Sequence, residues 1–148
     1  MTDAQRGLLT YLLNETHETL RRLRVVTEHL SLHILHAQHW PQLRILHLSG
    51  ERQFSPDMRL PYIALLSRMP GLRELVLDLA DPTAAGPQAI WPAGYDTVYP
   101  WTMLERLTLS QPDPDDSLFS HLPASLRTLS LRHYPREYLY DLEYYKLA

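Results

Sequence analysis

The chain has 148 residues, the length of a single domain, and 45% of them are hydrophobic, so a sizeable core can form. Its net charge of -3 at pH 7 speaks against general nucleic-acid binding, which needs a clearly basic surface. The absence of cysteine excludes disulfides, thiol catalysis and cysteine-bound zinc, and no apolar stretch approaches the roughly 20 residues of a transmembrane helix. We therefore expect an intracellular protein, cytoplasmic or nuclear, without a signal peptide, that binds neither nucleic acid nor membrane.

A short phrase, Leu-x-x-Leu-x-Leu, recurs along the chain. Four good copies begin at Leu43, Leu72, Leu104 and Leu126, and a weaker copy begins at Leu20. The successive spacings are 23, 29, 32 and 22 residues. Each phrase places apolar residues at alternate positions, which predicts a short strand with one buried face. Repetition at this spacing predicts a stack of similar units that bury their apolar faces against one another.

The segments between the phrases have helical features. Residues 1–19 are expected to form an N-terminal helix, because leucines recur at nearly every fourth position from Leu8 onward. Residues 27–38 alternate like a strand in part, but their place between two strands favours a helix. Pro61 suits the first turn of a helix over the apolar residues that follow it. Residues 116–122 have room for one or two helical turns.

Residues 80–100 are expected to form an irregular loop, because they contain four prolines and two glycines. This loop lengthens one spacing to 32 residues. Its aromatic side chains either anchor a protein partner or fold back over the repeat core. The aromatic candidates for partner binding in and beside this loop are Trp91, Tyr95, Tyr99 and Trp101. Residues 135–148, rich in tyrosine and leucine, are expected to form a final helix that covers the open end of the stack.

The repeated phrase resembles the leucine-rich-repeat superfamily. The copies that follow Trp40-Pro41 and Met69-Pro70 are similar to the irregular repeats of fungal F-box proteins. The resemblance covers about residues 20–134 and implies one α/β domain, a short irregular leucine-rich-repeat solenoid of about five repeats. Parallel strands would line its concave face, with helices or turns on the convex face. In F-box proteins an N-terminal F-box docks onto a ubiquitin-ligase adaptor, and the repeats bind the substrate.

Two features depart from that family pattern. The chain contains no F-box, so we expect either a stand-alone or a truncated repeat domain. The standard repeat has asparagine or cysteine at its ninth position, where the side chain bonds to backbone in the turn after the strand. Here the ninth positions are Glu28, Glu51, Ala80, Pro112 and Tyr134. We therefore expect the turns to close differently.

The residues between the leucines of each phrase should point away from the core, because side chains alternate along a strand. This concave face is basic at the first repeat, acidic in the middle and rich in hydroxyl groups near the end. A patchwork of this kind suits a specific protein partner better than nucleic acid. The predicted partner-binding residues are Arg22, Arg24, Ile45, His47, Glu74, Val76, Asp78, Arg106, Thr108, Thr128, Ser130 and Arg132. Other seventh positions of the phrases, Ser49 and Ser110 among them, extend this face.

Four histidines, His29, His33, His36 and His39, lie close together in the sequence. On one continuous helix the first three would share a face and could hold a transition metal. A solvated histidine face is the simpler interpretation, and we expect no metal site and no cofactor. The acidic run at Asp113, Asp115 and Asp116 lacks the glycine and glutamate of a calcium loop, so we expect a solvated turn that caps the next helix.

These observations favour a protein–protein interaction module that is not an enzyme. They do not identify its protein partner. The resemblance to F-box proteins implies one specific role for the module, the substrate-recognition part of an F-box-type ubiquitin-ligase adaptor. Two alternatives stay open. One is a truncated structural repeat domain that self-associates through its open ends, since uncapped sheet edges invite pairing. The other, less favoured, is a metal-dependent enzyme that uses the cluster from His29 to His39.

Overall fold

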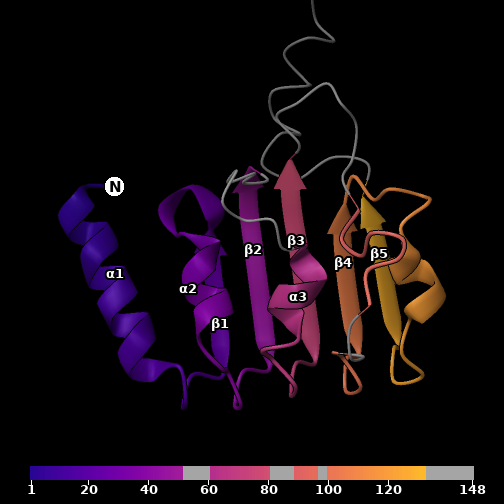
Figure 1. The fold of residues 1–148 in the computed structure, drawn as a ribbon, viewed down its shortest axis with the longest axis horizontal. Coiled ribbons are helices and arrows are strands. Elements are labelled where there is room, and N and C mark those ends of the chain that lie inside the picture. Colours follow the sequence, from indigo (N-terminus) through magenta and orange to yellow (C-terminus); the bar gives the residue numbers. More distant parts are fainter. Residues whose placement is uncertain (52–60, 81–88, 97–99, 133–148) are drawn as a thin grey trace, which may run out of the picture.

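The strands of the protein form one parallel sheet in a computed structural model, which describes residues 1–51, 61–80, 89–96 and 100–132 (Figure 1). The five strands are β1 (Arg22–Val26), β2 (Ile45–Glu51), β3 (Glu74–Ala80), β4 (Arg106–Ser110) and β5 (Thr128–Arg132). Each strand pairs with the next one in the chain, so the order across the sheet is β1-β2-β3-β4-β5. The predicted strands and the mixed α/β class are therefore confirmed.

The strands pair in step, so that equivalent positions of the phrase lie side by side. Leu46 pairs with Leu23 on one side and with Leu75 on the other, and Leu107 continues the row between Leu75 and Leu129. A shift of one residue would turn every leucine to the opposite face. The in-register pairing therefore keeps the leucines of all five strands on the same face of the sheet.

Among the described residues, one helix precedes β1, and helices or 3-10 turns follow β1, β2 and β4. They are α1 (Asp3–Thr16), the 3-10 turn η1 (Thr27–His29), α2 (Leu32–Ala37), α3 (Tyr62–Leu66) and the 3-10 turn η2 (Ser117–His121). In Figure 1, α2 and α3 lie over one face of the sheet, and α1 lies beside α2 at the β1 end. The helices predicted within residues 27–38 and after Pro61 are confirmed, and the turns predicted at residues 116–122 are of the 3-10 type. The predicted capping helix at 135–148 lies outside the described residues.

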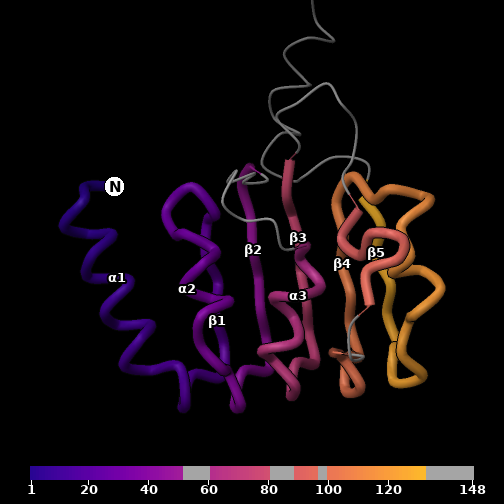
Figure 2. The backbone as a smooth tube through the Cα atoms, viewed as in Figure 1, coloured from indigo at the N-terminus to yellow at the C-terminus, as the bar shows by residue number. Residues whose placement is uncertain are grey.

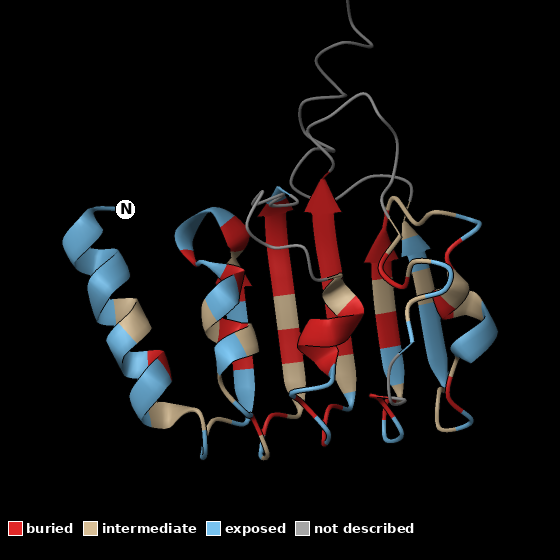
Figure 3. Ribbon diagram, in the orientation of Figure 1, coloured by how far each residue is buried: buried red, intermediate tan, exposed pale blue. Residues whose placement is uncertain are grey.

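The hydrophobic core lies between the sheet and these helices, and Figure 3 shows many buried residues there. Leu46, Leu75 and Leu107 have no exposed surface, and they belong to one cluster with Leu35 of α2 and Ile63 of α3. Burying one leucine side chain in this way contributes roughly 1.5–3 kcal/mol. The core thins at both ends. On β5, where no further described strand follows, Leu129 and Leu131 are 40% and 51% exposed.

The N-terminal helix contributes less to this core than its leucine spacing predicts. Leu13 is its one buried residue, and Leu9 packs partly against the core. Leu8, Tyr11 and Leu12 are instead 58%, 59% and 48% exposed. The helix lies beyond β1, so only one of its sides meets the rest of the described structure (Figure 1).

A turn of the same form precedes strands β2 to β5, and Figure 2 shows it along the lower edge of the sheet. In each turn, the first leucine of the phrase donates its backbone N–H to the carbonyl three residues earlier. Those carbonyls belong to Trp40, Met69, Trp101 and Pro123, at 3.0–3.3 Å. The first three of these residues have no exposed surface. The repeated unit therefore begins with a buried residue that the sequence analysis did not identify.

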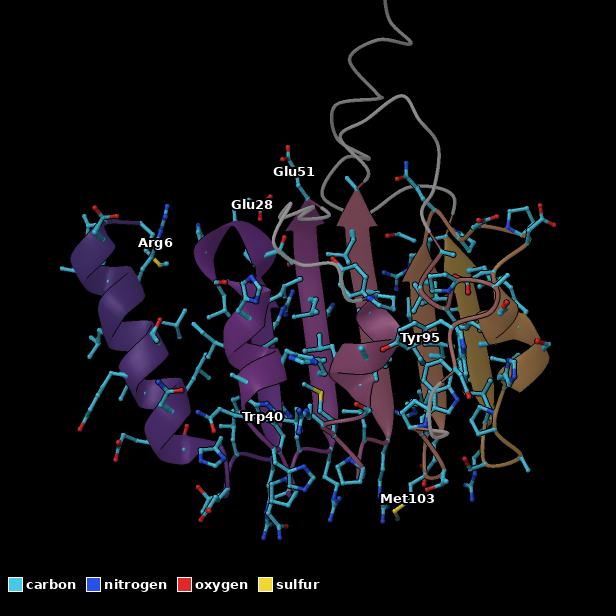
Figure 4. The ribbon with its side chains drawn as sticks, in the orientation of Figure 1. Arg6, Glu28, Trp40, Glu51, Tyr95 and Met103 are labelled. Atoms are coloured by element: carbon cyan, nitrogen blue, oxygen red, sulfur yellow. The ribbon has the colours of Figure 1, made fainter. Side chains whose placement is uncertain are left out.

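The turn after β1, which contains Thr27 and Glu28, is joined by its side chains to the end of β2. Glu28, at a ninth position, accepts a hydrogen bond from the backbone N–H of Glu51 at 2.8 Å, and Thr27 donates its hydroxyl to the carbonyl of Glu51 at 2.5 Å. Glu28 and Glu51 both lie at the upper edge of the sheet in Figure 4. Next to them, Gly50 has a φ of 107°, which a residue with a Cβ adopts only with strain. This turn thus closes without the usual asparagine, as expected.

Candidate functional site

The face of the sheet opposite α2 and α3 is the candidate site. None of the described helices lies over it (Figure 1). Because side chains alternate along a strand, those between the buried leucines point toward this face. We call it the open face. All twelve side chains predicted for the concave face lie on it. The structure thus brings together residues from five strands that are up to 110 residues apart in the sequence, from Arg22 to Arg132.

Strand pairing arranges the open face in cross-strand rows. The first row is Arg22, Ile45, Glu74, Arg106 and Thr128. The second row is Arg24, His47, Val76, Thr108 and Ser130. A third row pairs Val26 with Ser49 and Ser49 with Asp78 on one side, and Ser110 with Arg132 on the other. Neighbours within a row are close enough for their side chains to interact.

The charges on the open face are separated by strand. Both carboxylates, Glu74 and Asp78, are on β3, whereas the arginines lie on β1, β4 and β5. Arg106 approaches Glu74 at 3.4 Å, but its side chain is 67% exposed, so the pair contributes little to stability. Arg132 approaches Asp78 at 3.7 Å, with the carboxylate side chain only 7% exposed. The result is a negative centre with positive flanks.

A pocket of about 310 Å³ opens in the middle of this face. Its lining residues are Arg24, His47, Ser49, Glu74, Val76, Asp78, Thr108 and Arg132. All but Ser49 are among the predicted partner-binding residues, and Ser49 is a seventh position. Val76, the central residue of the second row, is only 8% exposed. The pocket therefore combines an apolar centre with a ring of charged and hydroxyl groups.

Asp78 is the most unusual group in the pocket. It is 6% exposed, and its Oδ1 has no hydrogen-bond partner among the described residues. Its Oδ2 lies 3.7 Å from Nη1 of Arg132, which is beyond hydrogen-bond distance. Buried polar groups in folded proteins are almost always hydrogen-bonded, because an unpaired one costs roughly 1–3 kcal/mol. The site thus contains a buried acceptor without a donor.

His47 lies beside this carboxylate. Burial lowers the pKa of His47 from its ordinary value of 6.5, and the charge of Arg24 lowers it further. Asp78 and Glu74 act in the opposite direction without reversing the shift. The imidazole therefore favours its neutral form near pH 7, in which one ring nitrogen donates and the other accepts a hydrogen bond.

The loop aromatics do not all reach the surface. Trp91 is 5% exposed and Trp101 has no exposed surface, and both belong to the core. Their rings meet edge to face at 6.1 Å, and Trp91 stacks on His121 at 4.2 Å. The prediction that Trp91 and Trp101 anchor a partner is therefore wrong in this structure. The alternative, that loop aromatics fold back over the core, is the one observed.

Tyr95 and Tyr99 complete the predicted loop set. Tyr95 is half-buried and packs against the core cluster. Its backbone carbonyl accepts a hydrogen bond from Nε1 of Trp91 at 3.0 Å. Tyr99 lies outside the described residues. The described part of this loop thus packs over the core and does not extend outward as a binding loop.

Asp116 holds the loop in place, a role that sequence reasoning missed. Its carboxylate accepts the backbone N–H groups of Ile90 at 2.5 Å and Trp91 at 3.0 Å. It also accepts the N–H of Leu118 at 3.0 Å and so caps η2, as predicted. Asp116 is only 5% exposed, so the prediction of a solvated turn is wrong for this residue. The cap was visible in the sequence, whereas the contact to a segment 25 residues away was not.

The histidine cluster does not form one face. His29 ends the separate turn η1, while His33 and His36 lie on α2 after a break in the helix. Among the described residues, no three histidine, cysteine, aspartate or glutamate side chains come together as metal ligands would. Burial, Arg68 and His33 lower the pKa of His36. The i, i+4, i+7 spacing fails because residues 30 and 31 interrupt the helix.

Comparisons with known proteins add no family. No protein-family model, curated protein or solved structure gives a significant match to this chain. Within the described ranges, no helix is both long and apolar enough to cross a membrane.

Proposed function

We propose that the protein is a leucine-rich-repeat-type solenoid whose open face binds a segment of another protein. One observation carries this proposal. One face of the sheet is sealed by helices and leucines, while the other presents ordered rows of charged and hydroxyl side chains around a pocket. The leucine core sets the register of these rows, and the register gathers charged, hydroxyl and apolar side chains from neighbouring strands around one pocket, which suits a binding surface. The separated charges favour a partner of matching charge pattern.

Two regularities support the proposal that the protein is a leucine-rich-repeat-type solenoid. Every strand aligns its phrase with the same residues of its neighbour, and strands β2 to β5 begin with the same turn. Side chains also bond between successive units, as Ser110 does when it donates to the carbonyl of Leu79 at 2.8 Å. Such nearest-neighbour contacts are what stabilise a stack of repeats.

The test is a charge reversal that preserves the ion pair. Glu74→Arg combined with Arg106→Glu exchanges the two charges of the 3.4 Å pair, which keeps opposite charges in the pair but reverses their positions on the open face. The matched control is Arg73→Glu with Glu105→Arg, which reverses the neighbouring 3.8 Å pair one position earlier, outside the rows of the open face. We expect the first double variant to lose captured partners at least tenfold by quantitative mass spectrometry, and the control to keep them. Equal partner profiles for both variants would refute the open-face proposal.

The more specific proposal, that the protein is the substrate-recognition part of an F-box-type ubiquitin-ligase adaptor, rests on the resemblance of the repeats. It predicts that a partner lost with the Glu74/Arg106 reversal carries ubiquitin in cells that contain the wild-type chain. Deleting the chain should raise the level of that partner and lower its ubiquitin modification. If the ubiquitin modification of the partner did not change, the binding proposal would stand and the ligase proposal would fall.

Self-association is a second candidate, favoured by exposed apolar groups at the two ends of the sheet. Leu131 on β5 is 51% exposed, and Tyr11 on α1 is 59% exposed. An edge strand with exposed apolar side chains can pair with another copy. Light scattering on wild type and Leu131→Arg tests this. A concentration-dependent dimer that disappears in the variant would support it, and a wild-type monomer at high concentration would refute it.

A further inference from the structure

We propose that the pocket of the open face binds a primary ammonium group, the side chain of a lysine in the partner protein. This inference rests on the proposed function, since it names the part of the partner that the open face holds. Its starting point is Asp78, whose Oδ1 is buried and has no donor among the described residues. A ligand that brings an N–H donor removes the cost of that unpaired oxygen, and a charged donor forms a stronger hydrogen bond than a neutral one.

The geometry around Asp78 selects an ammonium over a guanidinium. An arginine binds a carboxylate best through two parallel hydrogen bonds, one to each oxygen. Here Nη1 of Arg132 already lies 3.7 Å from Oδ2, so a second guanidinium would meet a like charge at that oxygen. A lysine ammonium is a compact charge that needs only one oxygen. The single free acceptor therefore matches lysine.

The pocket also accommodates the lysine stem. Glu74 and Asp78 lie on the same face of β3, about 13 Å apart along the strand at roughly 3.3 Å per residue. Val76 lies between them and offers an apolar surface for methylene groups. Long cationic side chains commonly pack their stems on apolar surface while the charged end reaches a polar group.

Neighbouring side chains from the adjacent strands complete the site. The hydroxyls of Ser49 on β2 and Thr108 on β4 line the same pocket and can accept the remaining ammonium protons. His47 adds no positive charge in its neutral form, which its lowered pKa favours. Arg24, whose guanidinium forms no ion pair with any described residue, lies on the β1 side. It favours an acidic residue next to the lysine in the partner.

The experiment uses the full chain and a defined probe, Nα-acetyl-lysine methylamide, followed by ¹⁵N NMR titration. We expect saturable shifts at the amides of His47, Ser49 and Thr108. Asp78→Asn should weaken binding at least tenfold, whereas Asp115→Asn, the same change on an exposed turn, should leave it unchanged. Because Asp78→Asn can also affect folding, Thr108→Lys is the second variant: it places an ammonium from the chain itself beside Asp78 and should abolish probe binding.

Two analogues test the chemistry of the probe. Nε-acetylation removes the charge, and an arginine analogue replaces the ammonium by a guanidinium, so both should bind at least tenfold more weakly. Equal binding of either analogue, or wild-type affinity in folded Asp78→Asn, would overturn the lysine proposal. If the Glu74/Arg106 reversal still abolished partner capture, the proposed function would stand without it. If neither experiment showed an effect, both would fall.

Discussion

Replacing Asp116 should destabilise the protein far more than the loss of an ordinary helix cap. Its carboxylate, 5% exposed, accepts three backbone N–H groups, from Ile90, Trp91 and Leu118. The first two belong to the loop after residue 80 and the third to η2. In Asp116→Ala all three donors lose their acceptor in a buried environment, and the loop loses its attachment to η2.

The magnitude follows from the number of donors. A typical cap substitution costs about 1 kcal/mol, and each buried donor left unpaired costs roughly 1–3 kcal/mol. Three donors make a loss of about 3–9 kcal/mol, which is a large part of the 5–15 kcal/mol that stabilises an ordinary domain. For a chain of this size, the midpoint of thermal unfolding should fall by about 10 °C or more.

Urea unfolding followed by circular dichroism measures the free energy, and the fluorescence of Trp91 and Trp101 reports the loop itself. Asp116→Asn keeps one acceptor oxygen and should lose about half as much stability. The control is Asp113→Ala, because Oδ1 of Asp113 accepts the N–H of Asp115 at 3.0 Å on the surface, so it should cost less than about 1 kcal/mol. A loss in Asp116→Ala as small as that of the control would refute the argument that the carboxylate fastens the loop.

Two further predictions concern the end of β2 beside Glu28 and the histidines. Gly50→Ala forces a Cβ toward the carboxylate of Glu28 at a φ of 107°, so we expect a loss of about 2 kcal/mol or more in urea unfolding, whereas Gly7→Ala, inside α1 with open space around it, should gain roughly 0.5–1 kcal/mol. Equal effects of the two changes would contradict this account of the turn. His47 has a lower pKa folded than unfolded, so the unfolded state binds its proton first and stability falls as the pH drops below about 6.5. Thermal unfolding from pH 7.5 to 5 should show this loss of stability. The loss should be smaller in His47→Gln, but not absent, because the pKa of His36 is lowered as well. A dependence of stability on pH that the substitution leaves unchanged would contradict the prediction.

Much of the sheet could be predicted from the repeated phrase, because every copy carries the same alternation of buried and outward residues. The burial of Leu46, Leu75 and Leu107 and the orientation of Glu74 and Asp78 follow from that alternation alone. The helix at 32–37 could be predicted only from its place between two strands, since its own residues alternate like a strand. The N-terminal leucines show the limit of periodicity, because the spacing from Leu8 predicts an apolar stripe but not which part of it finds a neighbour.

The sequence by itself therefore determined the strands and the two faces of the sheet, since these depend on residues near one another in the chain. The tertiary structure decided what each polar or aromatic group meets. Asp116 reaches Ile90 across 26 residues, and Oδ1 of Asp78 has no hydrogen-bond partner among the described residues. Trp91 and Trp101 are core residues. The local sequence pattern determines to which face of the sheet a side chain points, and the packing of distant segments determines which groups it contacts.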